Sequence, residues 1–395
     1  MTITDPQIRL SALSSLVRQA AVAGTFYPAE KAELSDTVTD LLNAVEQHSS
    51  TPKAIITPHA GYIYSGSTAA KAYASLGSIR DVIKRVILLG PAHRMYVKGL
   101  ALSSAHSFDT PLGSVKIDRQ AARRIKHLAQ VSVVDQAHEQ EHSLEVQLPF
   151  LQKCLTQFEL LPLVVGDASA QEVAEVLSIL WGGDETLIVI SSDLSHYHDY
   201  ASSQRMDVVT SMAIENMNFE QLDPQQACGY RPIQGLLTIA REREMQIERL
   251  GLCNSGDTAG SQDRVVGYGA WSLSENQVLN QKNRGILVEL ARKSIAQGFT
   301  TQQALKINIK QYPQSLTMLR ATFVTLKLKG QLRGCIGTTE AVQPLVSSVA
   351  DSAFKAAFRD PRFNALSEEE FRSTELSISV LTPPTPITFK NEAEL

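Results

Sequence analysis

Two uninterrupted apolar runs constrain the fold of this chain more than any other feature of its sequence. The segments RVILL, residues 85–89, and LIVI, residues 187–190, have the length of a β-strand and are apolar after the first arginine. A strand with one face in water alternates apolar and polar residues, whereas a strand covered on both faces is apolar throughout. We therefore expect a mainly parallel sheet with helices on both of its faces.

The stretches between and around these runs have the periodicity of amphipathic helices. Helical patterns cover residues 31–47, 118–129, 143–154, 170–181 and 203–216. Strands that alternate with helices favour an α/β architecture, because each connecting helix packs back on the sheet. The first part of the chain is thus predicted to be an α/β sandwich with a central, mainly parallel sheet.

A polar segment divides the chain. Residues 274–285 lack an apolar period, and 395 residues are more than one hydrophobic core usually serves. We interpret this segment as a linker between a first domain, residues 1–275, and a second, residues 285–395. The second domain mixes helical patterns at 285–296 and 344–358 with alternating patterns at 321–329 and 375–381. This mixture predicts a smaller α+β domain.

The composition excludes several classes of protein. The net charge is −4 without a basic block, so we expect no binding to DNA. No apolar run approaches the ~20 residues of a membrane helix, and the first ten residues lack the apolar core of a signal peptide. The four cysteines form no CxxC pair, which argues against a disulfide framework or a zinc ribbon. These features predict a cytoplasmic protein with no membrane partner.

Histidine is confined to one part of the chain. All nine histidines lie between His48 and His198, and three apolar strands run directly into small-residue loops that contain histidine. The first two loops carry His59 and His93, and the third carries Asp193 and His196. Ligands of open α/β sheets bind beyond the carboxyl ends of the strands, where the loops of parallel strands meet. The repeated pattern predicts one shared metal site.

The third ligand of this site is predicted to be Cys228. This cysteine lies in QACGYRPIQGLL, just before an apolar helix that begins near Ile233. A cysteine near the start of a helix tends towards the thiolate, which is the form that binds metal. A buried thiol without a ligand role is the alternative for this residue taken alone. We expect one transition metal ion, held by His59, His93 and Cys228.

The segment HEQEH, residues 138–142, matches the HExxH pattern of zinc peptidases. That pattern needs a helix whose other faces are buried, but here the flanks are polar and an apolar period begins only afterwards. Hydrolysis by zinc, with Glu139 as the general base, is therefore the least favoured function. Ser143 is expected to cap the helix that follows. His142 and Glu145 are candidates for a proton-transfer pair or for partners of the ligands, or else for capping and surface positions.

Seven stretches of the first domain resemble the Memo family, keep its order and span residues 18–271. They are AVAGTFYPA, TPHAGYIYSG, LLGPAHR, EHSLEVQLPF, ISSDLSHY, CGYRPI and DRVVGYGAW. The resemblance implies a fold akin to the class III extradiol ring-cleaving dioxygenases, with the metal ligands named above. It also places three further side chains around the same pocket, namely His142, Asp193 and His196.

The resemblance further implies binding of phosphotyrosine peptides and copper-dependent redox chemistry. The dioxygenases hold Fe(II) with two histidines and a carboxylate. If Cys228 takes the place of the carboxylate, the set of donor atoms becomes softer. Such a set favours copper or zinc over an Fe(II) ion that a catechol could chelate. The ion is therefore expected to be copper, iron or zinc, and catechol cleavage is not expected.

The second domain resembles the AMMECR-type domain. The stretches that carry the resemblance are LRGCIGT, AFKAAFRDPRF and ELSISVLTPP. That family continues beyond the point where this chain stops, at Leu395, so the domain is expected to be C-terminally incomplete. Arg333 and Cys335 face the same side of an alternating strand, and a guanidinium nearby favours a thiolate. Cys335 is thus a candidate nucleophile, or else a small buried residue.

Both domain types occur in microbial systems with a radical-SAM protein, so the resemblance implies a partner of that class. The favoured function is a metal-dependent oxidoreductase that acts on a small molecule or a peptide. His142 or His196 would move protons, Asp193 would orient an imidazole, and Tyr62 would contact the substrate.

The alternative function is a binding module. The same pocket would hold a peptide or a modified RNA without catalysis. Arg94 or Arg231 would then bind an anionic group of the ligand.

Overall fold

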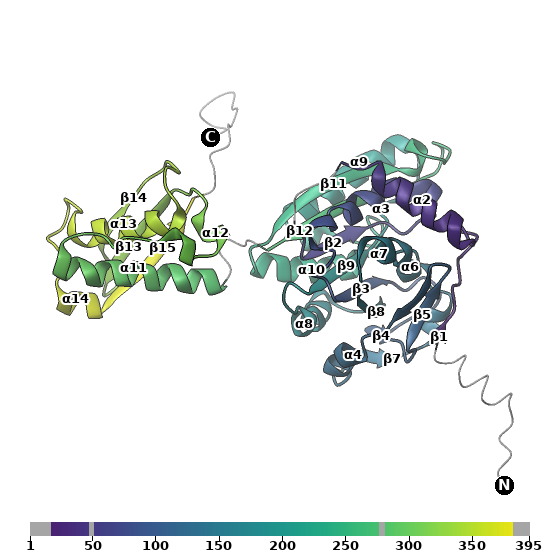
Figure 1. The fold of residues 1–395 in the computed structure, drawn as a ribbon. Helices are drawn as coiled ribbons and strands as arrows, with labels where there is room; N and C mark the ends of the chain where they lie inside the picture. Colours follow the sequence, from purple (N-terminus) through teal and green to yellow (C-terminus); the bar gives the residue numbers. More distant parts are fainter. Residues whose placement is uncertain (1–16, 47–50, 276–280, 382–395) are drawn as a thin grey trace, which may run out of the picture. The chain divides into compact units, whose positions relative to one another are not determined.

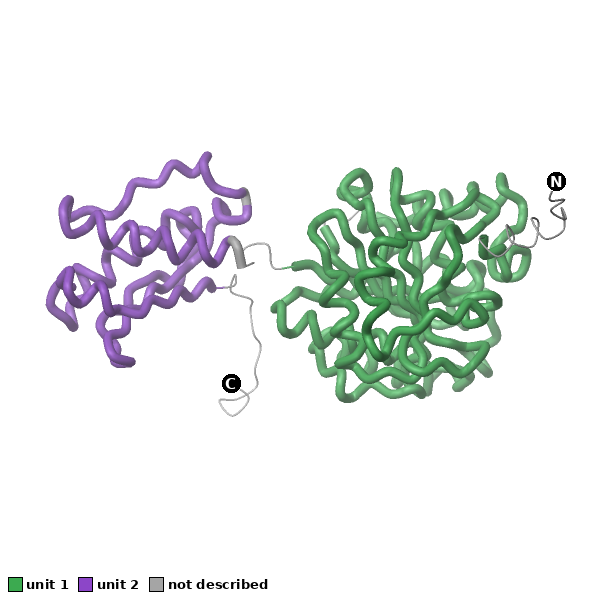
Figure 2. The backbone as a smooth tube through the Cα atoms, turned by 90° about the horizontal axis from the view of Figure 1, so that it is seen from below, with its two compact units in different colours: residues 1–275 green, residues 276–395 purple. Residues whose placement is uncertain are grey.

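The computed structural model describes residues 17–46, 51–275 and 281–381. The chain divides into two compact units, residues 1–275 and 276–395 (Figure 2). Residues 276–280 of the expected linker and the first ten residues, on which the absence of a signal peptide was argued, lie outside the described residues. None of the helices in the described parts of the chain has the length and hydrophobicity required to cross a bilayer.

The first unit is built on one large twisted sheet (Figure 1). The strands run in the order β10-β12-β2-β9-β3-β8-β4-β7, and β11 pairs with β12. The central strands β2, β9, β3 and β8 are parallel to one another, whereas β12 pairs with β2 and β4 pairs with β8 in antiparallel fashion. The bounds are β2 Ala54–Thr57, β3 Arg85–Pro91, β4 Leu100–Leu102, β7 Val131–Val133, β8 Glu159–Val165, β9 Thr186–Ser191, β10 His196–His198, β11 Gln246–Asn254 and β12 Val265–Ser274. The predicted mainly parallel sheet is confirmed.

Helices cover both faces of this sheet, as the apolar runs predicted. Alternate residues of β3 enter different cores: Val86 and Leu88 pack with α2, α3 and α7, whereas Ile87 and Leu89 pack with α4, α8 and α10. Every residue of β3 after Arg85 is buried, which explains why this strand is apolar on both sides. The helices are α2 Lys31–Asn43, α3 Tyr62–Ala74, α4 Arg119–Ile125, α5 Gln136–Glu139, α6 His142–Glu145, α7 Leu148–Cys154, α8 Ala170–Leu180, α9 Tyr200–Glu215 and α10 Tyr230–Glu242.

The helix expected over residues 143–154 is divided into α6 and α7. Pro149 lies in the first turn of α7 and has no N–H to donate to the carbonyl of Glu145, so a continuous helix would lack that bond. The prediction that Ser143 caps the helix is wrong. Glu141 is the cap of α6, and its side chain accepts a hydrogen bond from the Ser143 N–H. Local propensity favours serine at such a position, but here a buried carboxylate occupies it.

A small sheet borders the first unit, with the strand order β1-β5-β6. Its strands are β1 Val17–Arg18, β5 Ser107–Thr110 and β6 Gly113–Lys116. The pairing of β1 with β5 is parallel and fixes the position of Arg18.

The second unit is α+β, as predicted. An antiparallel sheet of order β14-β13-β15 packs against α13, which also contacts α11. The elements are α11 Gln281–Thr301, α12 Gln314–Thr317, β13 Thr322–Leu328, β14 Gln331–Gly337, α13 Leu345–Phe358, α14 Glu368–Arg372 and β15 Thr374–Val380. The alternating burial of β13 shows that one face of this sheet forms the core and the other is more exposed.

Candidate metal centre

Three histidines from separate segments of the first unit meet at one edge of the large sheet. His59 follows β2, His93 follows β3, and His142 begins α6. One ring nitrogen from each lies within 4.8 Å of the others, and the ring centroids are 4.6–5.4 Å apart. Strands β2 and β3 both pair with β9 in parallel, so their carboxyl ends bring the first two histidines together. This meeting of His59 and His93 is what the strand pattern predicted.

A glycine at the end of β3 lets the third histidine approach. A Cβ atom on Gly90 would lie 2.7 Å from the Ser143 Oγ, closer than side chains normally come. The Ser143 hydroxyl also donates a hydrogen bond to the carbonyl of Pro91 at 3.1 Å. Helix α6 therefore packs directly on β3, and His142 reaches the site from there.

The imidazoles of His59 and His93 are oriented by partners at Nδ1. The Nδ1 atom of His59 is 2.9 Å from the Ser191 Oγ, and that of His93 is 2.8 Å from a carboxylate oxygen of Glu141. Metal-binding histidines commonly hold their second ring nitrogen in this way, which fixes the ring and leaves Nε2 for the metal. The residues present therefore fit a metal ion bound through Nε2 of both rings.

The surroundings of His59 and His142 favour neutral imidazole, the form that binds metal. Burial lowers the pKa of His59 well below its usual value, and the neighbouring His93 lowers it further. Burial, followed by the neighbouring His59, lowers the pKa of His142 to about 4. The Nδ1 atom of His142 is 3.4 Å from Glu141 and makes no hydrogen bond to any described residue.

Glu141 is a buried residue of the site that the sequence analysis missed. Its carboxylate accepts hydrogen bonds from the backbone N–H and Nδ1 of His93 at 2.7 and 2.8 Å, and from the Ser143 N–H at 2.9 Å. Burial alone would raise the pKa of Glu141, but the bonds from His93 and Ser143 lower it to about 2. The residue is an ionised partner for His93. The HExxH match marks this segment, but its polar composition predicts exposure, whereas His138 and Glu141 are buried.

Cys228 lies beside the histidines. Its Sγ is 3.3 Å from the His59 Nε2, although it falls outside the 4.8 Å group that the three histidines form. Burial, reinforced by the nearby Asp193, raises the pKa of the thiol far above its usual value. Burial therefore outweighs the expected tendency of Cys228 towards thiolate at a helix start. Its ligand role stays a prediction, and His142 becomes a further candidate ligand.

Asp193 lies on the loop after β9, next to His59, and His196 is the first residue of β10. The Asp193 carboxylate is buried and accepts the His59 backbone N–H at 2.7 Å. Burial raises the pKa of Asp193, whereas that bond and the charge of His196 oppose the rise. His196 is half-buried, and its Nδ1 is 2.8 Å from the carbonyl of Leu194. Asp193 thus fixes the backbone of His59, and its role in orienting an imidazole stays a prediction.

Glu145, predicted to transfer protons or to support the ligands, and Tyr62, predicted to contact substrate, both make contacts within the fold. The Glu145 carboxylate is fully buried and accepts a hydrogen bond from the Tyr27 hydroxyl at 2.5 Å. The Tyr62 hydroxyl donates to the Val146 carbonyl at 2.7 Å, and its ring packs on Phe150. Both polar groups are therefore engaged in holding α6 and its surroundings.

In the second unit, Cys335 is half-buried and its surroundings differ from those expected. Arg333 forms an ion pair with Glu370. The Cys335 N–H donates to Asp360, and its carbonyl accepts from Arg362. Arg333 is therefore engaged by Glu370, and this geometry does not support activation of the Cys335 thiol by Arg333.

One cavity borders the candidate metal centre. It has a volume of about 320 Å³ and lies beyond the carboxyl ends of β3 and β8. Its lining includes Pro91, Ala92, Tyr96, Val165, Cys228 and Arg231. Arg231 forms an ion pair with Asp167 at 2.7 Å and donates to the Ala168 carbonyl at 2.6 Å. The cavity thus combines apolar walls with a neutralised ion pair.

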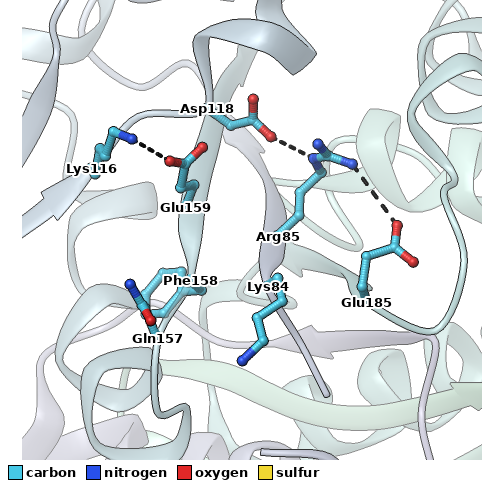
Figure 3. Close-up of a pocket in the computed structure, with 8 residues that line it drawn as sticks. All are labelled: Lys84, Arg85, Lys116, Asp118, Gln157, Phe158, Glu159 and Glu185. Atoms are coloured by element: carbon cyan, nitrogen blue, oxygen red, sulfur yellow. Dashed lines mark hydrogen bonds and ion pairs between the residues drawn. The ribbon is translucent and has the colours of Figure 1, made fainter. Parts of the chain in front are cut away.

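A second pocket, of about 480 Å³, lies at the opposite, amino ends of the strands (Figure 3). Arg85 points between Asp118 and Glu185, and Lys116 pairs with Glu159. Its charged groups largely neutralise one another, and Cys228, which lines the first cavity, is absent from its lining. The position rule for α/β sheets therefore favours the cavity beside Cys228 as the ligand site.

Comparison with known proteins agrees with the motifs. Residues 18–272 match the model of the family described as Memo-like protein. The chain belongs to this family. Residues 288–395 match the AMMECR1 model, so this Memo-like protein carries an AMMECR1 domain after its first domain.

The curated relatives match the first domain. A MEMO1 family protein from Aquifex aeolicus is 36% identical over 266 residues, which cover 64% of this chain and 97% of the relative. One from Nitrosopumilus maritimus is 32% identical over 277 residues, with 65% and 98% covered.

Two solved structures are also similar. An uncharacterized protein from Pyrococcus horikoshii is 35% identical, with a TM-score of 0.25 and 26% of this chain and 53% of that chain covered. One from Escherichia coli is 14% identical, with a TM-score of 0.38 and 54% and 98% covered.

Proposed function

We propose that this Memo-like protein is a metal-dependent redox enzyme that holds one transition metal ion with His59, His93 and His142, next to Cys228. The observation that carries the proposal is the convergence of three imidazoles, of buried His59, half-buried His142 and the more exposed His93, with their nitrogens within 4.8 Å. Burying polar rings is costly when they lack partners, and His142 Nδ1 makes no hydrogen bond to a described residue. A metal ion would compensate that cost.

The donor set supports a choice among the metals. Imidazole suits copper, zinc and iron, and a thiolate would shift the preference towards copper or zinc. Of these two, copper changes its oxidation state, so we propose copper as the ion for redox chemistry. When bound, it would supply one-electron transfer at the edge of the cavity that Cys228 lines.

The chain's own residues would prepare the site. Ser191 and Glu141 orient His59 and His93, and Asp193 fixes the backbone of His59. The cavity of about 320 Å³ suits a small molecule or the side chain of a peptide. His196 is half-buried and is proposed to move protons between the site and water. A radical-SAM protein remains the proposed partner.

The alternative, a binding module without catalysis, is less well supported. It needs a cation to bind an anionic group, and Arg231 is already paired with Asp167. Arg94 donates from Nε to the carbonyl of Gln140, away from the lining of the cavity.

Metal analysis of the full chain tests the proposal. Protein purified without added metal, and protein dialysed against copper, zinc or iron, would be measured by elemental mass spectrometry. We expect one equivalent of a redox metal in the parent and none in His59→Ala or His93→Ala. His127→Ala is the matched control, because His127 is exposed and is expected to leave the stoichiometry unchanged. Full metal content in both site variants would refute the proposal.

A further inference from the structure

A clamp near the start of the first domain holds the segment that carries His142. We define the clamp as residues 17–27, of which Arg18 and Tyr27 are buried. Its Phe26 ring packs on the His142 ring with centroids 4.7 Å apart. The clamp therefore touches one of the three histidines directly and also, through Arg18, the backbone that carries it.

Arg18 spans the segment with one guanidinium group. Its Nε donates to the carbonyl of His138 at 3.0 Å, and its Nη2 donates to the carbonyl of Glu141 at 2.9 Å. Its Nη1 forms an ion pair with Glu145. The planar fork of arginine presents its donors in fixed directions, so three acceptors from residues 138–145 are held in one arrangement. Arg18 is only 7% exposed, which protects these bonds from water.

Glu145 completes the clamp from the other side. Besides Arg18, it accepts the backbone N–H groups of Ala21 at 2.8 Å and Val22 at 3.0 Å, and the Tyr27 hydroxyl. A buried carboxylate with a cation and several donors is strongly fixed. Glu141 and His142 lie within the segment that Arg18 holds, and both belong to the candidate metal centre.

We propose that Arg18 is a positioning residue of the metal centre, which acts through the backbone of His138 and Glu141 to set the geometry of the Glu141–His93 pair and of His142. This inference rests on the proposed metal site. Loss of an outer partner of a metal ligand typically lowers metal affinity about 10–100-fold. Arg18 is one step further from the metal, so we expect the lower end of this range, about tenfold.

The substitution Arg18→Lys tests the proposal. Lysine keeps a positive charge near Glu145, but an ammonium on a flexible stem does not reproduce the fork that reaches both carbonyls. Arg18→Met would leave Glu145 buried without its cation and is expected to impair folding, so it is the less informative variant. The matched control is Arg85→Lys, which alters an arginine paired with Asp118 at the opposite end of the strands (Figure 3).

Two measurements on the full chain separate a positioning role from a merely structural one. Hydrogen–deuterium exchange of the metal-free protein is expected to show faster exchange over residues 138–145 in Arg18→Lys but not in Arg85→Lys. Titration with Co²⁺ alone is expected to show about tenfold weaker binding and altered ligand-field bands in Arg18→Lys. The control is expected to keep the parent affinity and spectrum.

The outcomes discriminate between the two proposals. Parent-like cobalt affinity and spectrum in Arg18→Lys would overturn the positioning role, whether or not exchange increases, and would leave the metal site intact. A parent protein that binds no metal would overturn the proposed function, and the positioning role with it. Equal losses of affinity in Arg18→Lys and Arg85→Lys would also overturn it, because a general loss of stability would then explain both.

Discussion

Replacement of Glu141 by glutamine removes the charge that orients His93 and changes little else in shape. The carboxylate is fully buried and accepts three N–H groups, two from His93 and one from Ser143. Glutamine keeps one acceptor oxygen, but its amide nitrogen must face a donor. At least one of the three N–H groups is then left without its acceptor.

The magnitude follows from the pKa of Glu141, which is lowered from 4.5 to about 2. A shift of this size corresponds to about 3 kcal/mol in favour of the charged carboxylate. We therefore expect Glu141→Gln to lower the free energy of unfolding by about 2–3 kcal/mol at neutral pH. Because the folded pKa is depressed, this contribution is present above pH 4.5 and is lost as the pH falls towards 2. The variant should lack that acid-dependent loss.

Metal affinity should fall in the same variant. A carboxylate on Nδ1 raises the basicity of the Nε2 that faces the metal, and its removal typically weakens binding about 10–100-fold. Urea denaturation measures the stability, and competitive zinc titration measures the affinity. Glu139→Gln is the matched control, since Glu139 is exposed in the same segment. A Glu141→Gln protein with parent stability and less than twofold weaker zinc binding would refute the reasoning.

Two further predictions concern the other donors and the buried histidine of the same segment. In the cobalt-loaded parent we expect a thiolate-to-cobalt charge-transfer band. Cys228→Ser should abolish this band, whereas His142→Ala should keep the band but bind cobalt more weakly. A band that persists without Cys228 would exclude its thiolate as a ligand. Burial lowers the pKa of His138 from 6.5 to about 4. The unfolded chain therefore takes up a proton first, and about 3 kcal/mol of stability is lost as the pH falls from 6.5 towards 4. Urea denaturation at pH 7 and 4.5 should show a smaller difference in His138→Met, and an equal difference would contradict this assignment.

The sheet and the positions of His59 and His93 could be predicted because they follow from local sequence patterns. An apolar run such as β3 requires cover on both faces, and the carboxyl ends of parallel strands place His59 beside His93. These arguments need only the chain order of strands and helices. They do not need to know which segments far apart in the sequence come into contact.

The rest of the site depends on such distant contacts. Glu141 and His138 are 1% exposed, yet their segment is polar in composition, and the groups that cover it include Arg18, about 120 residues earlier. The periodicity of the segment itself does not predict that its polar residues are buried by distant parts of the chain. The same reason applies to Cys335, where Arg333 shares the strand but its guanidinium pairs with Glu370.

The most direct measurement of the metal centre is anomalous diffraction from crystals of the full chain, recorded at the copper, zinc and iron edges. We expect one strong peak whose height rises sharply across the copper edge, about 2.0–2.2 Å from a ring nitrogen of each of His59, His93 and His142. The distance from that peak to the Cys228 Sγ then decides the fourth donor. No peak among the three histidines in metal-loaded crystals, or a peak elsewhere in the chain, would contradict the assignment of this site.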